Sequence, residues 1–513
     1  MTTLPTLDLL VVVVYLAGVV GLGCYFTRRS ATAREYTSAG GALPGWAVGL
    51  SVFGTFLSSN TFLGVPGKAY ATNFNAFVFG LSLPPAAYLA ARYFVPFYRD
   101  GGAISAYTHL ESRFGPWART FAVSCYLLTQ LARVATILFG VALALSPLMG
   151  WRIEAIIIGA GGLVTLYTLL GGIRAVVWTD VMQSIVLTGG ALIVAAILLF
   201  DVPGGPSQSF AIAREAGKFG LGSFGAGIGQ STVWVVWIYG LFVNLTNFGI
   251  DQNYVQRYHA ARSMSAARRS VWLGALLYLP VSLLFFGIGA GLFSYYRAQP
   301  ALLHDLRADV RANAGGSVTA GAATDPTDAQ LGDKVFPHFI ARRLPPGLTG
   351  IILAALLAAA MSSLDSSLNS SATVFLSDVY QRHAAAPDER AALRILRGAT
   401  IVGGAVGTAA ALAMIGIASI LDTWWLLAGA LSGPMLGLFM LGILSRAGSR
   451  AAAISVTVGT AVVVWMTVSP GDHWPPALRS PFHSNLTIAV GAAVIVIVGV
   501  AAARIARGSS KGD

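Results

Sequence analysis

Long apolar stretches, separated by short polar segments, make up most of this 513-residue chain. A transmembrane helix needs about 20 mostly apolar residues to cross a hydrocarbon core of about 30 Å. Such stretches occur at 7–26, 46–66, 76–98, 118–147, 154–171, 178–201, 232–250, 271–294, 348–378, 397–420, 424–445, 451–469 and 484–505. The pattern predicts an all-α polytopic membrane protein with about 13 transmembrane helices.

Composition and charge agree with a membrane protein. Hydrophobic residues make up 55% of the chain and charged residues 11%, whereas soluble domains carry about 25% charge. The first stretch, 7–26, is too long for a signal-peptide core and is read as a retained helix. The net charge of +12 reflects Lys and Arg in short loops rather than nucleic-acid binding. Their distribution predicts an external N-terminus and a cytoplasmic C-terminus.

The loop at 295–346 is the exception to this charge pattern, because it is basic and yet must be external. Long loops cross the membrane largely regardless of charge, so the topology stands. The middle of the loop, about 305–330, is rich in Ala, Gly, Thr and Asp. We expect a variable or partly disordered insert there.

One apolar segment carries the run Ala359-Ala-Met-Ser-Ser-Leu-Asp-Ser-Ser-Leu-Asn-Ser370. On a helix, one stripe holds Ala359, Ser362, Ser363, Ser366, Ser370, Thr373 and Ser377, whereas Met361, Leu364, Leu368 and Phe375 fall opposite. Hydroxyls gain nothing from lipid, so the stripe should face protein or water. Asp365 lies beside the stripe, and an ionisable group at this depth indicates a functional site. Oxygen atoms close together suit a small hard cation.

Two other apolar segments contain residues that weaken a helix. Ser, Asn and Thr compete for backbone groups between Gly54 and Thr61, which predicts an unwound centre near 57–60. Asn244, Thr246, Asn247 and Gly249 mark a similar weak point in the stretch 232–250. Interrupted helices in corresponding positions of two halves indicate a transporter site at mid-membrane.

Several short motifs follow one another along the chain in an order typical of one transporter family. They are Tyr36 with Gly40-Gly-Ala-Leu-Pro-Gly-Trp46, the segment 105–115, Gly171-Gly-Ile-Arg-Ala-Val-Val-Trp-Thr-Asp180, Asp251-Gln-Asn-Tyr-Val-Gln-Arg-Tyr258, the serine run and Gly433-Pro-Met-Leu-Gly437. Through them the chain, from about 34 to 450, resembles the sodium:solute symporter family. Segments 44–53, 57–59, 68–70 and 133–135 look most like its bacterial sialic acid symporters.

The resemblance implies one transmembrane transporter domain, 1–513, with a LeuT-like five-plus-five inverted repeat. The first repeat would span 46–201 and the second 232–445, with 295–346 as its external loop. One extra helix, 7–26, would precede them, and two C-terminal helices, 451–505, would follow.

The resemblance also implies where Na+ binds. One ion would be held by Gly54, Leu57, Ala359, Ser362 and Ser363, because an unwound backbone exposes carbonyls that two hydroxyls can face. The alternative is that both serines bond to their own helix or to a neighbour.

A second Na+ site occurs in some family members, and here it maps to Asp180, Ser362, Asp365 and Ser366. The sialic acid branch tends to carry Ser where this chain has Asp365, which adds a charge. Either the site holds Na+ more strongly, or one carboxyl carries a proton, or Asp365 pairs with an arginine. The alternative for Asp180 is a pair with a nearby base such as Arg174.

Arg133 is the candidate for binding substrate, with Gln130 nearby. In sialic acid symporters the matching arginine binds the substrate carboxylate, and Arg suits bidentate capture. Ser58 and Thr61 match hydroxyls that contact substrate, and Phe56 is close in sequence. The alternative is that Arg133 pairs with Asp180, Asp365 or backbone carbonyls.

Three further positions bear on the substrate. Gly80 stands where a Gln is expected for sialic acid, so the pocket is wider or tuned to another acid. Asn244 matches a sugar-contacting position, and Asn247 replaces a gating tyrosine of the sugar cotransporters. For both, an interhelical hydrogen bond is the alternative.

These features predict a Na+-coupled symporter that imports a carboxylated solute such as sialic acid by alternating access. A neutral sugar, a proline-like amino acid or a monocarboxylate is the alternative substrate, and a membrane sensor is the alternative class. No nucleophile–base–orienter set indicates an enzyme. We expect a functional monomer in lipid, in a bacterial-type inner membrane, with Na+ and substrate as partners and no nucleic acid.

Overall fold

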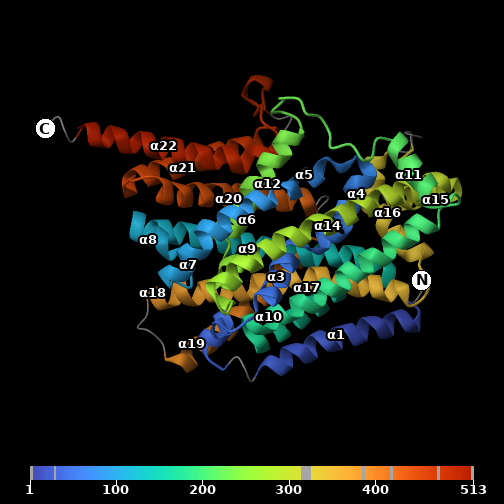
Figure 1. Ribbon diagram of the computed structural model, residues 1–513, viewed down its shortest axis with the longest axis horizontal. Helices are drawn as coiled ribbons and strands as arrows, with labels where there is room; N and C mark the ends of the chain where they lie inside the picture. Colours follow the sequence, from blue (N-terminus) through green and yellow to red (C-terminus); the bar gives the residue numbers. More distant parts are fainter. Residues whose placement is uncertain are drawn as a thin grey trace.

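The computed structural model describes residues 4–27, 31–313, 325–383, 388–415, 420–470 and 474–509. These residues are almost entirely helical, and the long helices lie side by side (Figure 1). The long helices are α1 (Thr6–Thr27), α9 (Pro116–Met149), α10 (Ile153–Phe200), α12 (Val233–Ile250), α14 (Met264–Ala298), α17 (Leu348–Val374), α19 (Glu389–Ala413), α20 (Ile420–Leu444), α21 (Ser449–Val468) and α22 (Thr487–Ser509). The shorter ones are α2 (Ala33–Ser38), α3 (Gly45–Phe56), α4 (Ser59–Ala71), α5 (Val78–Leu81), α6 (Leu83–Leu89), α7 (Val95–Gly101), α8 (Thr108–Phe114), α11 (Gly205–Glu215), α13 (Gln252–Ala260), α15 (Pro300–Asn313), α16 (Asp328–Arg343) and α18 (Gln381–His383).

The described residues contain 10 helices long and apolar enough to cross a membrane, or up to 11 if one bent pair is a single span. Helix α10 covers both predicted spans 154–171 and 178–201 and has 48 residues. A straight helix of that length would reach about 72 Å, more than twice a bilayer core of about 30 Å. It is broken at Gly172, where φ is 56° and ψ is −159°. The count of 13 spans therefore stays a prediction.

The first predicted break lies where the sequence places it. Helices α3 and α4 meet at a bend of 52°, and Leu57 and Ser58 between them have extended backbone. Ser58 caps α4, because its hydroxyl accepts a hydrogen bond from Thr61 N at 3.3 Å. The cap explains why the chain resumes a helix immediately, so that only two residues are unwound.

The second break lies further along the chain than predicted. Helix α12 continues through Asn244, Thr246, Asn247 and Gly249, and the break is at Asp251 (φ −80°, ψ 118°). The Asp251 carboxylate accepts a hydrogen bond from Asn253 N at 2.8 Å and so caps α13. A cap that starts the second half-helix, rather than the weak helix formers before it, sets this break.

Helix α17, which carries the serine run, is central and buried. The stripe prediction is confirmed in that its hydroxyls face protein, although Met361, Leu364 and Leu368 on the opposite side are buried too. Asp8 of α1 accepts hydrogen bonds from Gly347 N at 2.7 Å and Gly350 N at 2.6 Å. An anionic side chain of one helix thus satisfies the free N–H groups at the start of another.

Two of the sequence motifs pack against each other. A Cβ at Gly172 would lie 2.7 Å from the Tyr36 carbonyl oxygen, so only glycine fits there. Arg174 donates a hydrogen bond to the carbonyl of Ala39 at 2.9 Å. These contacts join the break in α10 to α2.

Two helices lie in the predicted loop at 295–346. Residues 305–313 lie in α15 and 328–330 begin α16, whereas 314–324 fall outside the described residues. Helix α16 crosses α4 closely, since a Cβ at Gly332 would lie 2.8 Å from the Gly67 carbonyl. Phe336 also stacks on Phe62 with ring centroids 5.7 Å apart.

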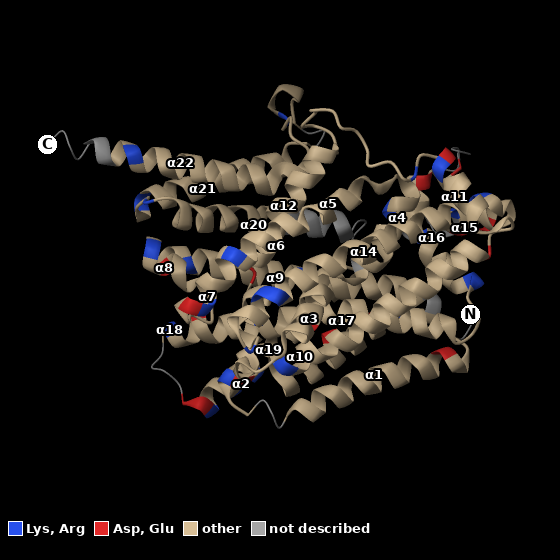
Figure 2. Cartoon of the chain, viewed as in Figure 1, with Lys and Arg blue, Asp and Glu red and all other residues tan. Residues whose placement is uncertain are grey.

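Charged residues gather at the two ends of the helix bundle (Figure 2). Helix α1 begins at one end, and α22 finishes at the other, which also holds α8 and α18 (Figure 1). We call this second end the α8–α18 end.

Candidate functional site

Five oxygen atoms predicted to bind Na+ converge where α17 passes the break between α3 and α4. Ser362 Oγ lies 3.2 Å from Gly54 O, 3.5 Å from Leu57 O and 3.2 Å from Ala359 O. Ser363 Oγ lies 3.5 Å from Leu57 O. The carbonyls of Gly54, near the end of α3, and of Leu57, in the break, face α17, which brings both hydroxyls to them.

The spacing of these oxygens fits shared ligation of a cation. A direct O–H···O bond is about 2.7–2.8 Å long, so most of these contacts are loose as hydrogen bonds. Ca²⁺, a hard cation, binds oxygens at about 2.3–2.6 Å, which puts two ligands at right angles about 3.3–3.7 Å apart. Ser362 also contacts Ala359 of its own helix, so bonding within the helix and across the break coexist.

Beside these oxygens, Asp180 forms a buried ion pair that the sequence did not predict. Arg257 Nη2 lies 2.8 Å from Asp180 Oδ2, and both side chains are fully buried. Asp180 also accepts a hydrogen bond from Ser51. The suggested pairing of Asp180 with Arg174 is wrong, because Arg174 donates its hydrogen bond to the carbonyl of Ala39. Arg257 further donates to Ser366 Oγ at 2.7 Å, so its guanidinium lies between two of the four residues predicted for a second ion.

Asp365, the remaining carboxylate of that set, is held by hydroxyls. Tyr167 OH donates to Asp365 Oδ2 at 2.9 Å and Thr179 Oγ1 donates at 3.3 Å. Ser366 Oγ lies 3.4 Å from Asp365 Oδ1. Asp365 therefore contacts hydroxyl groups rather than the arginine that was suggested as its partner. If both aspartates are ionised, Arg257 balances only one of their two negative charges.

Arg133, on α9, lies beside the second break. Its Nη1 is 3.7 Å from Asp251 Oδ2, a longer separation than a direct charge-assisted hydrogen bond. The suggested pairing of Arg133 with Asp180 or Asp365 is not what the structure shows. Gln130, one turn before Arg133, accepts a hydrogen bond from Asn253 Nδ2 at 3.4 Å. Arg133 and Gln130 thus both face the start of α13.

Phe56, at the end of α3, belongs to an aromatic cluster next to these groups. Its ring centroid lies 5.1 Å from that of Tyr254 and 5.7 Å from that of Tyr278. A Cβ at Gly80 would lie 3.3 Å from the Tyr278 ring. A side chain at position 80 would therefore press against the Tyr278 ring. Ser58 and Thr61 lie at the same break, with their hydroxyls 3.4 Å apart.

The two asparagines of α12 differ in their surroundings. Asn244 is fully buried and donates to Ser82 Oγ at 3.0 Å. This is the interhelical hydrogen bond named as the alternative to a sugar contact. Asn247 is partly exposed.

Among the residues of this region that sequence reasoning missed are Asp251, Arg257 and Tyr167. The first two lie in a motif that was recognised, and their charge at membrane depth was a signal that each needs a partner. Tyr167 lies in an apolar stretch and gives no such signal.

Two broken helices that meet at mid-bundle, with a group of oxygen atoms at one break and a basic group at the other, are typical of a secondary membrane transporter. The model of the sodium:solute symporter family matches residues 36–459. The chain is 34% identical to the sodium/sialic acid symporter NanT of Aliivibrio fischeri, covering 90% of this chain and 88% of that protein. It is 36% identical to the sodium/sialic acid symporter SiaT of Proteus mirabilis, covering 88% and 87%.

A comparison with solved structures indicates the same family. The substrate-bound, outward-open state of a Na+-coupled sialic acid symporter matches with a TM-score of 0.85 and 33% identity, over 98% of both chains. The chain therefore belongs to the sodium:solute symporter family, with its LeuT-like fold. It is a multi-pass, Na+-coupled transporter and not an enzyme.

Proposed function

We propose that this protein imports a carboxylated solute, sialic acid being the first candidate, together with Na+. The observation that carries the proposal is the position of Arg133, beside the start of α13, the helix that also carries Tyr254 of the aromatic cluster around Phe56. A guanidinium suits a carboxylate because its N–H groups match the two carboxylate oxygens. The named activity of the relatives NanT and SiaT supports the same substrate.

We assign Na+ to the oxygens of Gly54, Leu57, Ala359, Ser362 and Ser363. A second Na+ at Asp180, Ser362, Asp365 and Ser366 stays part of the proposal, with Arg257 as an internal cation beside it. Binding of Na+ joins α17 to the broken helix. Substrate that binds better to the joined state is thereby coupled to the ion.

The remaining parts of the proposal concern architecture. The repeats span 46–201 and 232–445, the helix 7–26 precedes them, and 451–505 follow. The α8–α18 end is cytoplasmic, because α1 begins at the opposite end and basic loops lie here (Figure 2). The functional unit is a monomer in lipid.

A thermal-shift screen of the purified protein tests the substrate. Sialic acid, monocarboxylates, neutral sugars and proline are compared in Na+ and in K+. We expect sialic acid to raise the melting temperature in Na+ only, and Arg133→Ala to abolish the shift. Arg113→Ala is the control, because Arg113 binds carbonyls of Gly442 and Ser445 at the far end of α8. A sialic acid shift that survives Arg133→Ala would refute the carboxylate role, whereas a shift with only another solute would replace the substrate.

A further inference from the structure

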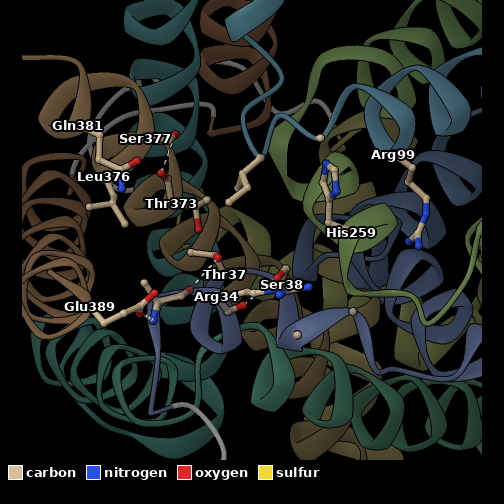
Figure 3. Close-up of a pocket in the computed structure, with 15 residues that line it drawn as sticks. Arg34, Thr37, Ser38, Arg99, His259, Thr373, Leu376, Ser377, Gln381 and Glu389 are labelled. Carbon is tan, nitrogen blue, oxygen red and sulfur yellow. Dashed lines mark hydrogen bonds between the residues drawn. The ribbon is translucent and has the colours of Figure 1, made fainter. Parts of the chain in front are cut away.

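A cavity of about 580 Å³ opens at the α8–α18 end (Figure 3). Its volume lies within the range of about 300–1,000 Å³ that is typical of small-molecule sites. It is lined by residues of α2, α7, α13, α17 and the segments that follow α7 and α17, among them Arg34, Thr37, Arg99, His259, Thr373 and Ser377. Thr373 and Ser377 continue the hydroxyl stripe of α17, and Figure 3 shows Thr37 close to Thr373.

One side chain joins the elements that form the inner wall of this cavity. Gln256 Nε2 of α13 lies 2.6 Å from Thr37 O, 2.7 Å from Asn369 Oδ1 and 3.1 Å from Thr373 Oγ1, and these three acceptors share its two amide hydrogens. Gln256 is 1% exposed, so it lies behind the cavity surface rather than on it. Thr37 and Thr373 both line the cavity. Gln256 therefore holds α2 and α17 together directly above the cavity.

Beyond Gln256, polar contacts continue along α17 towards the proposed Na+ site. Ser370 Oγ donates to Asn253 Oδ1 at 2.7 Å. One turn further, Ser366 accepts a hydrogen bond from Arg257, and after another turn Ser362 reaches the carbonyls of the first break. From Thr373 to Ser362 the distance along the helix is about 16 Å at about 1.5 Å per residue. A continuous polar seam thus leads from the Na+ site to the cavity, and Gln256 closes it.

We propose that the cavity is the vestibule through which the transported solute and Na+ leave, and that Gln256 is the plug that must break its hydrogen bonds before release. The proposal rests on the proposed transport function. The charges at the cavity fit an anionic solute, since Arg34 and Arg99 line it together with one acid, Glu389. The Glu389 carboxylate already accepts a hydrogen bond from Ala33 N at 2.9 Å.

Cysteine accessibility tests the plug. The two native cysteines, Cys24 and Cys125, are replaced by Ser, and Ser370→Cys is added as a reporter above Gln256. Ser377→Cys, in the cavity wall, is the positive control for access and folding. A membrane-impermeant maleimide is applied to inside-out vesicles in Na+. We expect Gln256→Met, which keeps length but loses the hydrogen bonds, to raise the labelling rate at position 370 at least fivefold and to leave position 377 unchanged.

Gln252→Met is the matched control, because Gln252 lies on the same helix and binds the backbone of Ile104 and Ala106 instead. An unchanged rate at position 370 in Gln256→Met, or an equal rise in Gln252→Met, would overturn the plug. Should Gln256→Met not fold, as judged by position 377, Gln256→Glu gives the same readout. Labelling needs neither a substrate nor a gradient. An unchanged labelling rate at position 370, in a protein that still shows Na+-driven uptake, therefore refutes only this inference. Absence of uptake refutes the proposed function.

Discussion

At the residue scale, Ser362 is the side chain with the most contacts at the proposed Na+ site, because its hydroxyl reaches carbonyls of three residues. Ser362→Ala removes one ligand oxygen and leaves the backbone ligands in place. A hydrogen bond to a charged group is worth about 1.5–3 kcal/mol, and an ion–oxygen contact of similar strength corresponds to a loss of roughly 10- to 150-fold in Na+ affinity.

Titration of the melting temperature with Na+ measures this loss. Ser367→Ala is the control, since the Ser367 hydroxyl bonds only one turn back, to Ser363 O at 2.8 Å. Equal Na+ affinity in Ser362→Ala and the parent would remove Ser362 from the site.

The Asp180–Arg257 pair gives a second prediction at this scale. Both side chains are fully buried, and removal of one partner from a buried pair typically costs about 3–5 kcal/mol. Arg257→Met should therefore lower the melting temperature markedly. Adding Asp180→Asn should restore part of the loss, because the unpaired charge is gone. A double variant less stable than Arg257→Met would show that the charge on Asp180 is satisfied by something other than Arg257.

At the element scale, a helix break was predicted correctly where the local composition sets its position. It was predicted wrongly where a single hydrogen bond sets its position. The first break follows from Gly54 to Thr61 and lies at Leu57 and Ser58. The second break depends on the cap at Asp251, whereas the weak helix formers before it remain helical. Helix α15 lies partly inside the segment 305–330, where an insert was expected, and its packing against α16 is a tertiary contact that the sequence does not show.

The contact between α14, α15 and α16 predicts a pH dependence. His338 of α16 bonds to Tyr296 OH at 2.6 Å and lies 3.5 Å from Asp309 of α15. Burial lowers the pKa of His338 below its usual value of about 6.5, an effect that Asp309 opposes. The folded protein therefore favours the neutral imidazole. This stability is present above pH 6.5 and is lost as the pH falls through the folded-state pKa.

Melting temperatures between pH 7.5 and 5 check this dependence. We expect His338→Gln, which does not titrate, to lose less stability over this range than the parent. His304→Gln is the control, because His304 is an exposed residue of α15. Parallel curves for the parent and His338→Gln would contradict the prediction.

At the scale of the whole molecule, the membrane class, the family and the region of the proposed cation site could be predicted from the sequence. Apolar length and a stripe of hydroxyls are properties of single segments, so they are visible in the chain itself. The partners Arg257 for Asp180, Asp251 for Arg133 and Tyr167 for Asp365 could not be assigned. Each pair joins segments more than 75 positions apart, and only the packing of α9, α10, α13 and α17 brings them together.

The central claim is that a Na+ gradient drives a carboxylated solute through this protein. Uptake of radiolabelled sialic acid into proteoliposomes, with Na+ outside and K+ inside, tests it most directly. We expect accumulation above the external concentration, which collapses when Na+ is equal on both sides or replaced by K+. Uptake that is the same with and without the Na+ gradient, in protein that binds sialic acid, would contradict it.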